Sequence, residues 1–386
     1  MTSIYINDYA VMSRLGMNRE ETLLSLKSLE PPRPDTPFKL NDGTQTKLAA
    51  LPSELPESAQ GRTRTNRIAS TLLEHLAPSI EQLKASVPAE RIAVIVGTST
   101  TGIEEALGTL KNRLTDGSWP EDYKFADQEL GDLADHISQE IGAEGPSYTV
   151  STACTSATKA MISAMRLIRT GMADAVICGG VDSLSALTVN GFHALSSVSA
   201  DQCSPYGATR DGINIGEGGG LFILSKTPSE WKLLGGAETS DAYHISSPDP
   251  EGTQAERAVR TALGEAGLSP ENIDFIHMHG TGTELNDLAE GQVVMRIFGP
   301  EKPAMSTKGM TGHTLGAAGA IQLAINLLAM KNGFYPPHIY DGNRDPELAG
   351  IRLTAPQEAA TSRLETSLCA SYAFGGSNAV IVIGRE

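Results

Sequence analysis

Cationic side chains are scarce in this sequence. Its 386 residues include 30 Lys and Arg against 46 Asp and Glu, which gives a formal net charge of −16. Nucleic acids and anionic membrane surfaces attract proteins with an excess of positive charge, so an acidic chain matches neither. We therefore expect neither nucleic acid nor a membrane as a partner.

Long apolar runs and a leader-like start are also missing. No apolar run approaches the roughly 18 residues of a membrane-spanning helix. Polar and acidic residues appear early, which is unlike a secretory signal peptide. The only cysteines lack metal-ligand spacing and do not form a disulfide framework: Cys154, Cys178, Cys203 and Cys369. We expect a cytoplasmic protein with reduced thiols and no metal site.

What is present is a globular composition, 40% hydrophobic and 20% charged, in a chain long enough for two fused units. Residues 31–56 are rich in Pro, Asp and Thr without periodicity and predict a surface excursion, and a helix is expected over about 20–29. Continuous apolar runs predict buried strands at 91–98, 173–180, 221–224, 272–278 and 379–383.

The two halves of the chain repeat one order of elements. A strand, a turn and a helix surround residue 154, and the same order surrounds residue 313. Sequence identity between the halves is slight, so the repeat is one of element order. This order predicts two α/β units, residues 1–230 and 231–386, with layered, parallel-rich sheets.

Residues 151–160 (Ser-Thr-Ala-Cys-Thr-Ser-Ala-Thr-Lys-Ala) join a strand-like segment to a helical pattern. Cys154 is thus predicted at a helix N-terminus, where backbone N–H groups and the helix dipole favour a thiolate. The alternative is an inert buried cysteine. His279 and His313 follow strands of the second half, and ligands gather at the carboxyl ends of such strands. This joint placement favours a nucleophilic Cys154.

These residue types together can transfer and activate acyl groups. A thiolate takes an acyl group from a thioester, and neutral imidazoles donate hydrogen bonds to a developing enolate oxygen. Backbone N–H groups stabilise a tetrahedral oxyanion, each by about 3–4 kcal/mol. The glycine-lined Phe374 turn offers such an N–H, and Lys308 lies at a turn close to the site.

Six motifs resemble signatures of the elongating β-ketoacyl-acyl-carrier-protein synthases, and the resemblance runs from about Arg62 to the end of the chain. The motifs are TACTS at 152–156, RDG at 210–212, SDAYH at 240–244, HGTGT at 279–283, KGMTGHTLGAAG at 308–319 and FGGSN at 374–378. The resemblance implies a thiolase-like α/β fold, in which duplicated halves form a five-layered αβαβα core, and it implies a dimer.

The resemblance also implies a decarboxylative Claisen condensation that extends an acyl chain by two carbons. Cys154 would carry the acyl chain, while His279 and His313 would bind the malonyl thioester and promote loss of carbon dioxide. Lys308 would support His313. The N–H groups of Cys154 and Phe374 would form the oxyanion hole, and Phe374 would gate the malonyl side.

Further residues would bind the substrate and its carrier. Thr281, Thr283 and Asn378 would contact the phosphopantetheine arm or the substrate, and Ile103 matches the gate of the acyl pocket. Because the acyl carrier protein brings the substrate on its own phosphopantetheine, the resemblance implies no other cofactor and no metal. Candidates to meet an acidic carrier are Arg62, Arg64 and Arg67.

Two departures from the family pattern accompany these motifs. Gln322 stands where the family commonly has a glutamate, so the usual ionic partner of Lys308 is missing. The run Ser204-Pro205-Tyr206-Gly207 replaces a segment that normally holds a docking arginine.

The alternative function is that of a silent, chain-length-factor-like subunit in a ketosynthase heterodimer. Such subunits typically lack the cysteine, which this chain keeps. A thiolase would need a second catalytic cysteine, but the one candidate, Cys369, is predicted to lie in a buried strand. The initiating synthases use Cys, His and Asn, so they fit the Cys-His-His set of this chain less well. A homodimer and a heterodimer both stay open. Residues 190–195 with 210–217 resemble synthases of aryl-polyene or related pathways, against housekeeping fatty-acid elongation.

Overall fold

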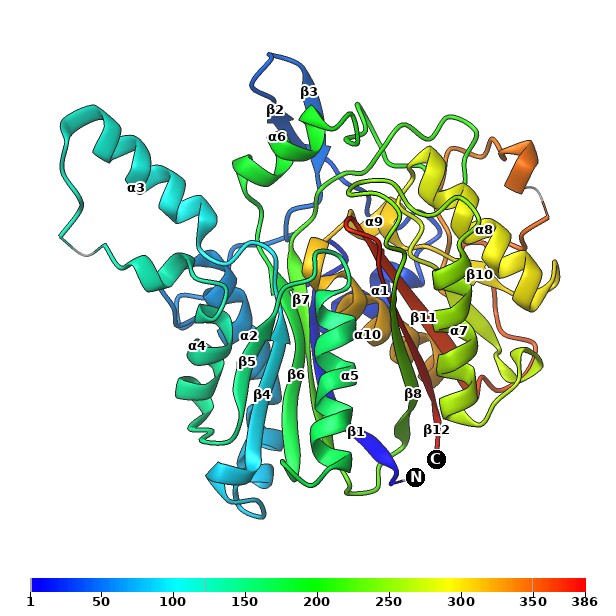
Figure 1. Ribbon diagram of the computed structural model, residues 1–386, viewed down its shortest axis with the longest axis horizontal. Helices are drawn as coiled ribbons and strands as arrows, with labels where there is room; N and C mark the ends of the chain where they lie inside the picture. The colour runs from blue at the N-terminus through cyan, green and yellow to red at the C-terminus, as the bar shows by residue number, and fades with distance from the viewer. Residues whose placement is uncertain (1, 122, 349) are drawn as a thin grey trace.

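The computed structural model describes residues 2–121, 123–348 and 350–386 (Figure 1). The first half contributes strands β1 (Ile4–Met12), β4 (Ile92–Gly97), β5 (Ser147–Val150), β6 (Ala175–Asp182) and β7 (Gly218–Ser225). The second half contributes β8 (Trp231–Ser240), β9 (Phe275–His277), β10 (Ala304–Met305), β11 (Thr366–Ala373) and β12 (Ser377–Arg385). Together they hydrogen-bond in the order β10-β9-β11-β12-β8-β1-β7-β6-β4-β5.

This order is a structural repeat. Strand β4 pairs in parallel with β5 and β6, and β9 pairs in parallel with β10 and β11. Strands β6–β7–β1 then continue antiparallel, as do β11–β12–β8. The two halves join where β1 pairs with β8. The expected duplication is therefore present strand by strand.

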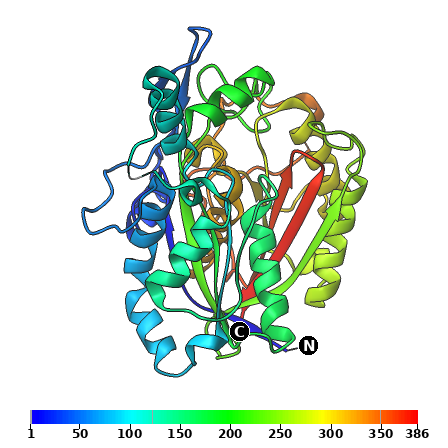
Figure 2. The ribbon, with the colours of Figure 1, turned by 60° about the vertical axis from the view of Figure 1, so that its left-hand side comes forward.

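Helices separate the sheet into layers (Figures 1 and 2). Helices α5 (Ser156–Arg169) and α10 (Ala318–Asn332) share one apolar cluster with strands of both halves. Helices α2 (Arg64–Lys84) and α4 (Asp132–Ile141) pack on the first half, and α7 (Thr253–Ala266) and α8 (Glu284–Phe298) on the second. These layers form the predicted αβαβα core.

The remaining helices are peripheral or short. They are α1 (Arg19–Leu26), α3 (Ile103–Asp116), α6 (Ala186–Ala194) and α9 (Lys308–Thr311). Single 3₁₀ turns cover Ala89–Arg91, Phe125–Gln128, Pro270–Asn272, Leu315–Ala317 and Pro346–Leu348. Among the described residues, no helix is long and apolar enough to cross a membrane.

Segment 31–56 differs from the expectation of an irregular excursion. It contains a two-stranded hairpin of β2 (Thr36–Lys39) and β3 (Gln45–Leu48). The turn between them uses Gly43 at φ 91°, and the Asp42 carboxylate accepts a hydrogen bond from the Thr44 N–H at 2.9 Å. Asp-Gly is a common hairpin turn. This dipeptide indicated the hairpin, although the segment as a whole has the composition of an irregular loop.

The glycines around position 220 serve close backbone packing, as expected. A Cβ atom on Gly179 of β6 would lie 2.0 Å from the carbonyl oxygen of Gly220 on β7. A side chain there would force the two central strands apart.

The sheet edge at β5 and the adjacent helix α3 are exposed. Strand β5 is the last strand of the sheet, and α3, which has no buried residue, projects beyond it (Figure 1). Large apolar side chains are exposed on and after this helix, at Leu110, Leu114, Trp119, Phe125 and Leu130. An unpaired edge strand beside exposed apolar groups is typical of a subunit interface.

Candidate active site

Cys154 lies in a tight turn between β5 and α5. The preceding Ala153 adopts a left-handed φ of 52°, a conformation that strains a residue with a Cβ atom. The Thr155 hydroxyl donates to the Thr152 carbonyl at 2.8 Å and contacts the Ser377 hydroxyl at 3.0 Å. The turn therefore fixes the thiol and ties it to the loop that carries Phe374.

His279 follows β9, and buried carboxylates of α8 hold its loop. Glu290 accepts hydrogen bonds from the His279 and Gly280 N–H groups at 2.6 and 2.7 Å. Asp287, one turn earlier, accepts from the Thr281 N–H at 3.0 Å. Burial raises the pKa of both carboxyl groups, and backbone N–H donors oppose it: those of Gly280 and His279 for Glu290, and those of Tyr206 and Gly282 for Asp287. Two buried carboxylates thus fix the loop backbone, and neither was among the site residues predicted from the sequence.

His313 follows α9 in a position equivalent to that of Cys154 in the first half. Its Nδ1 accepts a hydrogen bond from the Leu315 N–H at 3.0 Å. A neutral ring that accepts at Nδ1 carries its proton on Nε2. Burial, followed by the charge of Lys308, holds the His313 pKa well below its usual value, so the ring stays neutral. His313 therefore presents an N–H donor to the site.

Lys308, the first residue of α9, contacts His279 and not His313. Its Nζ lies 3.3 Å from His279 Nδ1 and also donates to the His279 carbonyl oxygen. Its effect on His313, which the sequence predicted it to support, is through its charge, which lowers the His313 pKa. Burial lowers the pKa of Lys308, and Glu290 acts in the opposite direction. An ammonium facing Nδ1 places the His279 proton on Nε2, as in His313.

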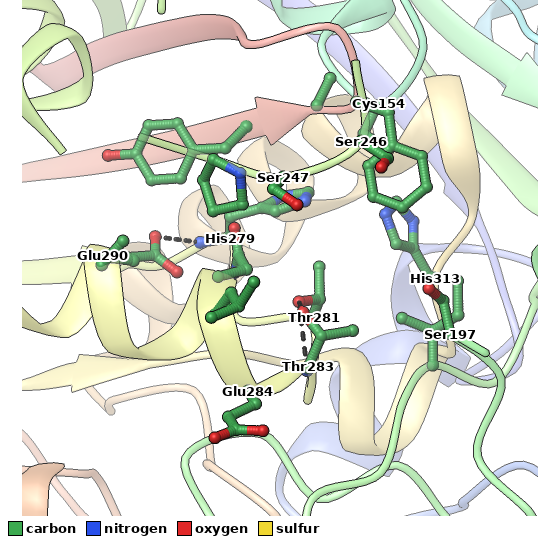
Figure 3. A pocket seen from close by; sticks show the side chains of 18 of the residues that line it. Cys154, Ser197, Ser246, Ser247, His279, Thr281, Thr283, Glu284, Glu290 and His313 are labelled. Atoms are coloured by element: carbon green, nitrogen blue, oxygen red, sulfur yellow. Dashed lines mark hydrogen bonds between the residues drawn. The ribbon is translucent and has the colours of Figure 1, made fainter. Parts of the chain in front are cut away.

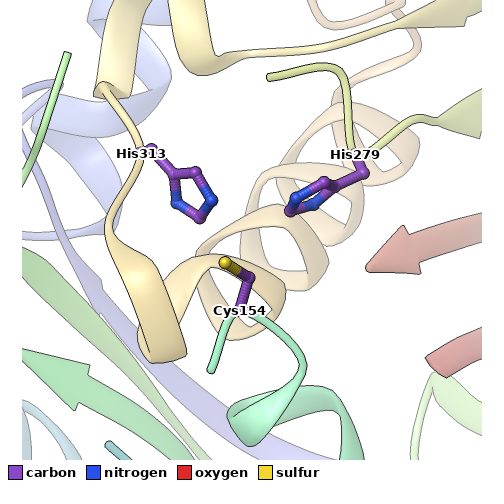
Figure 4. Close-up of side chains that lie close together, drawn as sticks. All are labelled: Cys154, His279 and His313. Atoms are coloured by element: carbon purple, nitrogen blue, oxygen red, sulfur yellow. The ribbon is translucent and has the colours of Figure 1, made fainter. Parts of the chain in front are cut away.

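The three reactive side chains meet at one point (Figure 4). The Cys154 Sγ and one ring nitrogen of each histidine all lie within 4.8 Å of one another. The two imidazoles are nearly perpendicular, with ring centroids 5.2 Å apart. The structure thus brings together Cys154, His279 and His313 from separate segments of the chain.

Sulfur and two imidazole nitrogens also suit a zinc ion, but their surroundings do not. A metal-bound histidine usually donates its outer N–H to an acceptor. Here both outer Nδ1 atoms face donors, the Leu315 N–H and the Lys308 ammonium. The outer hydrogen bonds therefore fit two N–H donors and disfavour a metal centre.

The thiol opens into a cavity of about 380 Å³ (Figure 3). Cys154, His279 and His313 lie at its inner end, and Thr281, Thr283, Phe374 and Asn378 also line it. The Thr281 and Thr283 hydroxyls are 2.8 Å apart. The Asn378 amide donates to Asp241 Oδ1 at 2.6 Å, so it shapes the wall through Asp241. Ile103, at the start of α3, does not line the described part of this cavity.

Phe374 lies at the mouth, in the turn between β11 and β12. The residue is 37% exposed, and its ring centroid lies 5.5 Å from that of Phe192 on α6. Gly375 and Gly376 follow with φ of 83° and 73°, which residues with side chains seldom adopt. Within the described residues, no hydrogen bond runs from the N–H group of Phe374 or of Cys154 to another residue. Both amides are thus available to a ligand.

The predicted docking arginines have unequal surroundings. Arg64 makes two hydrogen bonds, at 2.7 and 2.6 Å, to Glu217, whose side chain is buried. Arg62 pairs with Asp127 at 2.7 Å, and Arg67 reaches the Pro56 carbonyl at 3.4 Å. Arg64 therefore serves an internal ion pair, and we withdraw it as a docking residue. Arg62 and Arg67 remain a prediction.

The protonation of Cys154 also differs from the expectation. Burial raises the pKa of the Cys154 thiol to about 12, and Lys308 only partly opposes this. The expected thiolate does not form because burial disfavours its charge more than Lys308 stabilises it, and α5 begins only at Ser156, two residues after the cysteine. The resting group at neutral pH is the thiol.

We therefore expect alkylation of Cys154 by iodoacetamide to keep accelerating between pH 8 and 10. The rate follows the thiolate fraction, which rises about tenfold per pH unit below the pKa. An ordinary cysteine levels off near its pKa of about 8.5. Peptide mapping of Cys154 measures the rate, and a plateau below pH 8 would show that the thiol is already ionised.

Comparison with known proteins identifies the family. Residues 43–229 match the β-ketoacyl synthase N-terminal domain, and residues 232–340 match the β-ketoacyl synthase C-terminal domain. The chain belongs to the β-ketoacyl synthase family. It is 32% identical over 315 residues to 3-oxoacyl-[acyl-carrier-protein] synthase 2 of Staphylococcus aureus strain COL, which covers 77% of this chain and 76% of that protein.

A polyketide enzyme and solved structures are also similar to this ketosynthase. The tetracenomycin polyketide synthase ketoacyl synthase alpha subunit of Streptomyces glaucescens is 33% identical over 330 residues, which cover 78% of this chain and 76% of that one. A chain in the complex of the ketosynthase ApeO with its chain length factor ApeC from Xenorhabdus doucetiae matches with a TM-score of 0.94 and 36% identity, covering 100% of this chain and 98% of that one. These matches confirm the thiolase-like fold and a condensing acyltransferase.

Proposed function

We propose that Cys154, His279 and His313 carry out a decarboxylative condensation between an acyl group and a carrier-bound malonyl group. The observation that carries the proposal is the meeting of the thiol with two neutral imidazoles at the inner end of one cavity. A silent chain-length-factor-like subunit would not need this arrangement. The reaction has two stages, and each uses a different part of the site.

In the first stage, Cys154 takes up the acyl chain. The Cys154 thiol loses its proton as the sulfur attacks the thioester carbonyl, the carbonyl-to-sulfur bond of the incoming thioester breaks, and the departing carrier thiolate takes up one proton, so that no net proton is gained or lost. The oxyanion that forms can accept hydrogen bonds from the Cys154 and Phe374 N–H groups, which donate to no other described residue. Each such donor is worth about 3–4 kcal/mol in the transition state.

In the second stage, the malonyl thioester replaces the departed carrier. Its carboxylate leaves as carbon dioxide, and the electron pair of the broken carbon–carbon bond passes into an enolate. Nε2–H groups of His279 and His313 donate to the enolate oxygen. The enolate carbon then attacks the acyl group on Cys154, and the sulfur leaves as thiolate. The product is a β-ketoacyl thioester two carbons longer.

The substrate of this chemistry is proposed to be an acyl chain on an acyl carrier protein, without any further cofactor. Thr281 and Thr283 line the entrance with hydroxyls that suit the amides of a phosphopantetheine arm. The 33% identity to a polyketide synthase ketoacyl synthase alpha subunit supports a polyketide type of chain, and the resemblance of residues 190–195 and 210–217 supports the related aryl-polyene type. Supplying a panel of saturated, polyunsaturated and aromatic acyl carriers, followed by malonyl carrier, and weighing the products tests this choice.

A subunit partner is proposed on the side of β5 and α3, where the edge strand and the exposed apolar groups lie. Either a second copy or a chain-length-factor-like subunit of the same fold would cover this face. The boundary between the proposed halves, 1–230 and 231–386, falls where the two family matches meet. We place the protein in the cytoplasm, supported by its four free, buried cysteines.

Charge reversal of Arg62 and Arg67 to Glu should raise the KM for the carrier protein and reduce its dependence on salt. Both changes are expected because an acidic carrier would lose attraction during docking.

Arg64→Met should instead lower the free energy of unfolding by about 2 kcal/mol, since it leaves the buried Glu217 without its charged donor. Steady-state kinetics and urea unfolding separate the two effects. An unchanged KM in the double reversal would reject the docking role.

A further inference from the structure

Another buried histidine lies just beneath the active site and takes no part in the chemistry above. His277 is the last residue of β9, two positions before His279, and it is fully buried. Its Nδ1 lies 2.7 Å from Asn326 Oδ1, and its Nε2 lies 3.0 Å from the Thr307 hydroxyl. Both ring nitrogens are therefore engaged, one toward α10 and one toward the loop before α9.

The direction of these hydrogen bonds follows from Asn326. The Asn326 amide nitrogen donates to Ser367 Oγ and to Cys369 Sγ, both at 3.1 Å. Its oxygen is thus an acceptor for the His277 Nδ1–H, which leaves a lone pair on His277 Nε2. That lone pair accepts the Thr307 hydroxyl proton. Burial lowers the pKa of His277 to about 3, so the ring remains in this neutral form.

Thr307 is the residue from which Lys308 begins its helix. The Thr307 carbonyl accepts hydrogen bonds from the Met310 and Thr311 N–H groups, both at 2.9 Å, and these bonds start α9. Lys308 then reaches back to His279. A continuous series of contacts therefore runs from α10 through His277 and Thr307 to the ammonium beside the catalytic ring.

Helix α10 also holds the residue between the two histidines. Gln322, one turn before Asn326, donates from Nε2 to the Met278 carbonyl at 2.8 Å. The two amide side chains of α10 thus hydrogen-bond to two consecutive residues, His277 and Met278, immediately before His279. The glutamine that stands in place of the family's glutamate contributes a neutral contact to the strand end.

We propose that His277 is a positioning residue, which holds Thr307 and thereby places the Lys308 ammonium against His279 Nδ1. This inference rests on the proposed function, since the positioned pair acts in the malonyl stage. Loss of the contact frees Lys308 from His279, so the His279 ring can carry its proton on either nitrogen. The malonyl stage should suffer more than the loading of Cys154.

Paired variants isolate the contact. His277→Phe removes both ring hydrogen bonds at similar volume, whereas His277→Gln keeps an N–H for Asn326 and an oxygen for Thr307. Thr307→Val deletes only the hydroxyl, and Thr307→Ser retains it. We expect His277→Phe and Thr307→Val to slow malonyl decarboxylation at least tenfold, with Cys154 acylation changed less than twofold. His277→Gln and Thr307→Ser should restore most of the rate.

A second readout follows Lys308 without turnover. The ionisable groups that interact with Lys308 are Glu290, Asp287, Cys154, Cys203, His277, His279 and His313. The charge of Lys308 lowers the pKa of the Cys154 thiol. Displacing the ammonium should therefore slow iodoacetamide alkylation of Cys154 near neutral pH in His277→Phe and Thr307→Val, but not in their partners. This measurement remains valid even for a protein that forms no condensation product, which would refute the proposed function alone. Equal losses in both half-reactions with unchanged alkylation would overturn the positioning role.

Discussion

Cys154→Ala is expected to abolish condensation by at least about 10³-fold and to leave malonyl decarboxylation in place. Without the thiol no acyl enzyme forms, so the enolate has no electrophile in the site. The two N–H donors that act on the malonyl group belong to His279 and His313, whose outer hydrogen bonds do not involve Cys154. The half-reactions should therefore separate in this variant.

Release of carbon dioxide from malonyl carrier and formation of β-ketoacyl product measure the two activities side by side. Cys178→Ala is the matched control, because Cys178 is a free, fully buried cysteine of β6. That control should keep both activities. Ketoacyl product from Cys154→Ala would show that another group carries the acyl chain.

The second large effect is expected at the histidines. His279→Ala and His313→Ala each remove one N–H donor to the enolate oxygen and should each slow decarboxylation by about 10²–10³-fold. Their double variant should lose less than the product of the two effects, because both donors serve one oxygen. Acylation of Cys154 by an acyl thioester should decline far less, since backbone amides stabilise that oxyanion.

Rates of carbon dioxide release and of mass gain on Cys154, measured for each variant, test this division. His338→Ala is a useful control: His338 is buried and hydrogen-bonded to Ser306 and Pro205, and it does not line the described cavity. Equal losses of acylation and decarboxylation in both catalytic-histidine variants would contradict their assignment to the malonyl stage.

The sequence predicted the catalytic residues that directly follow recognisable strands. Cys154 and His313 follow equivalent strands of a repeated unit, so their approach to one cavity could be predicted from element order. The strand that ends at His277 was likewise marked by its apolar run. These features depend on local pattern and on the known geometry of parallel strands.

Other features depend on side-chain packing that a pattern does not contain. Lys308 could turn to either histidine, and only the path of α9 sets it against His279. Asp287 and Glu290 accept hydrogen bonds from the His279 loop only because α8 packs behind that loop, which the sequence pattern does not show. The one available sequence signal was a pair of acidic residues, three positions apart, shortly after the HGTGT motif. The raised pKa of Cys154 results from burial, which outweighs the opposing effect of the Lys308 charge.

The central claim is that Cys154 carries the acyl chain which the malonyl unit extends. Intact-protein mass spectrometry tests it most directly: the protein is loaded with one acyl carrier, mapped, and then given malonyl carrier labelled in its free carboxyl group. We predict one acyl group on Cys154, its disappearance on malonyl addition, release of the label as carbon dioxide, and a β-ketoacyl carrier two carbons longer. An acyl group on any other residue, or product formed while the Cys154 adduct persists, would contradict the claim.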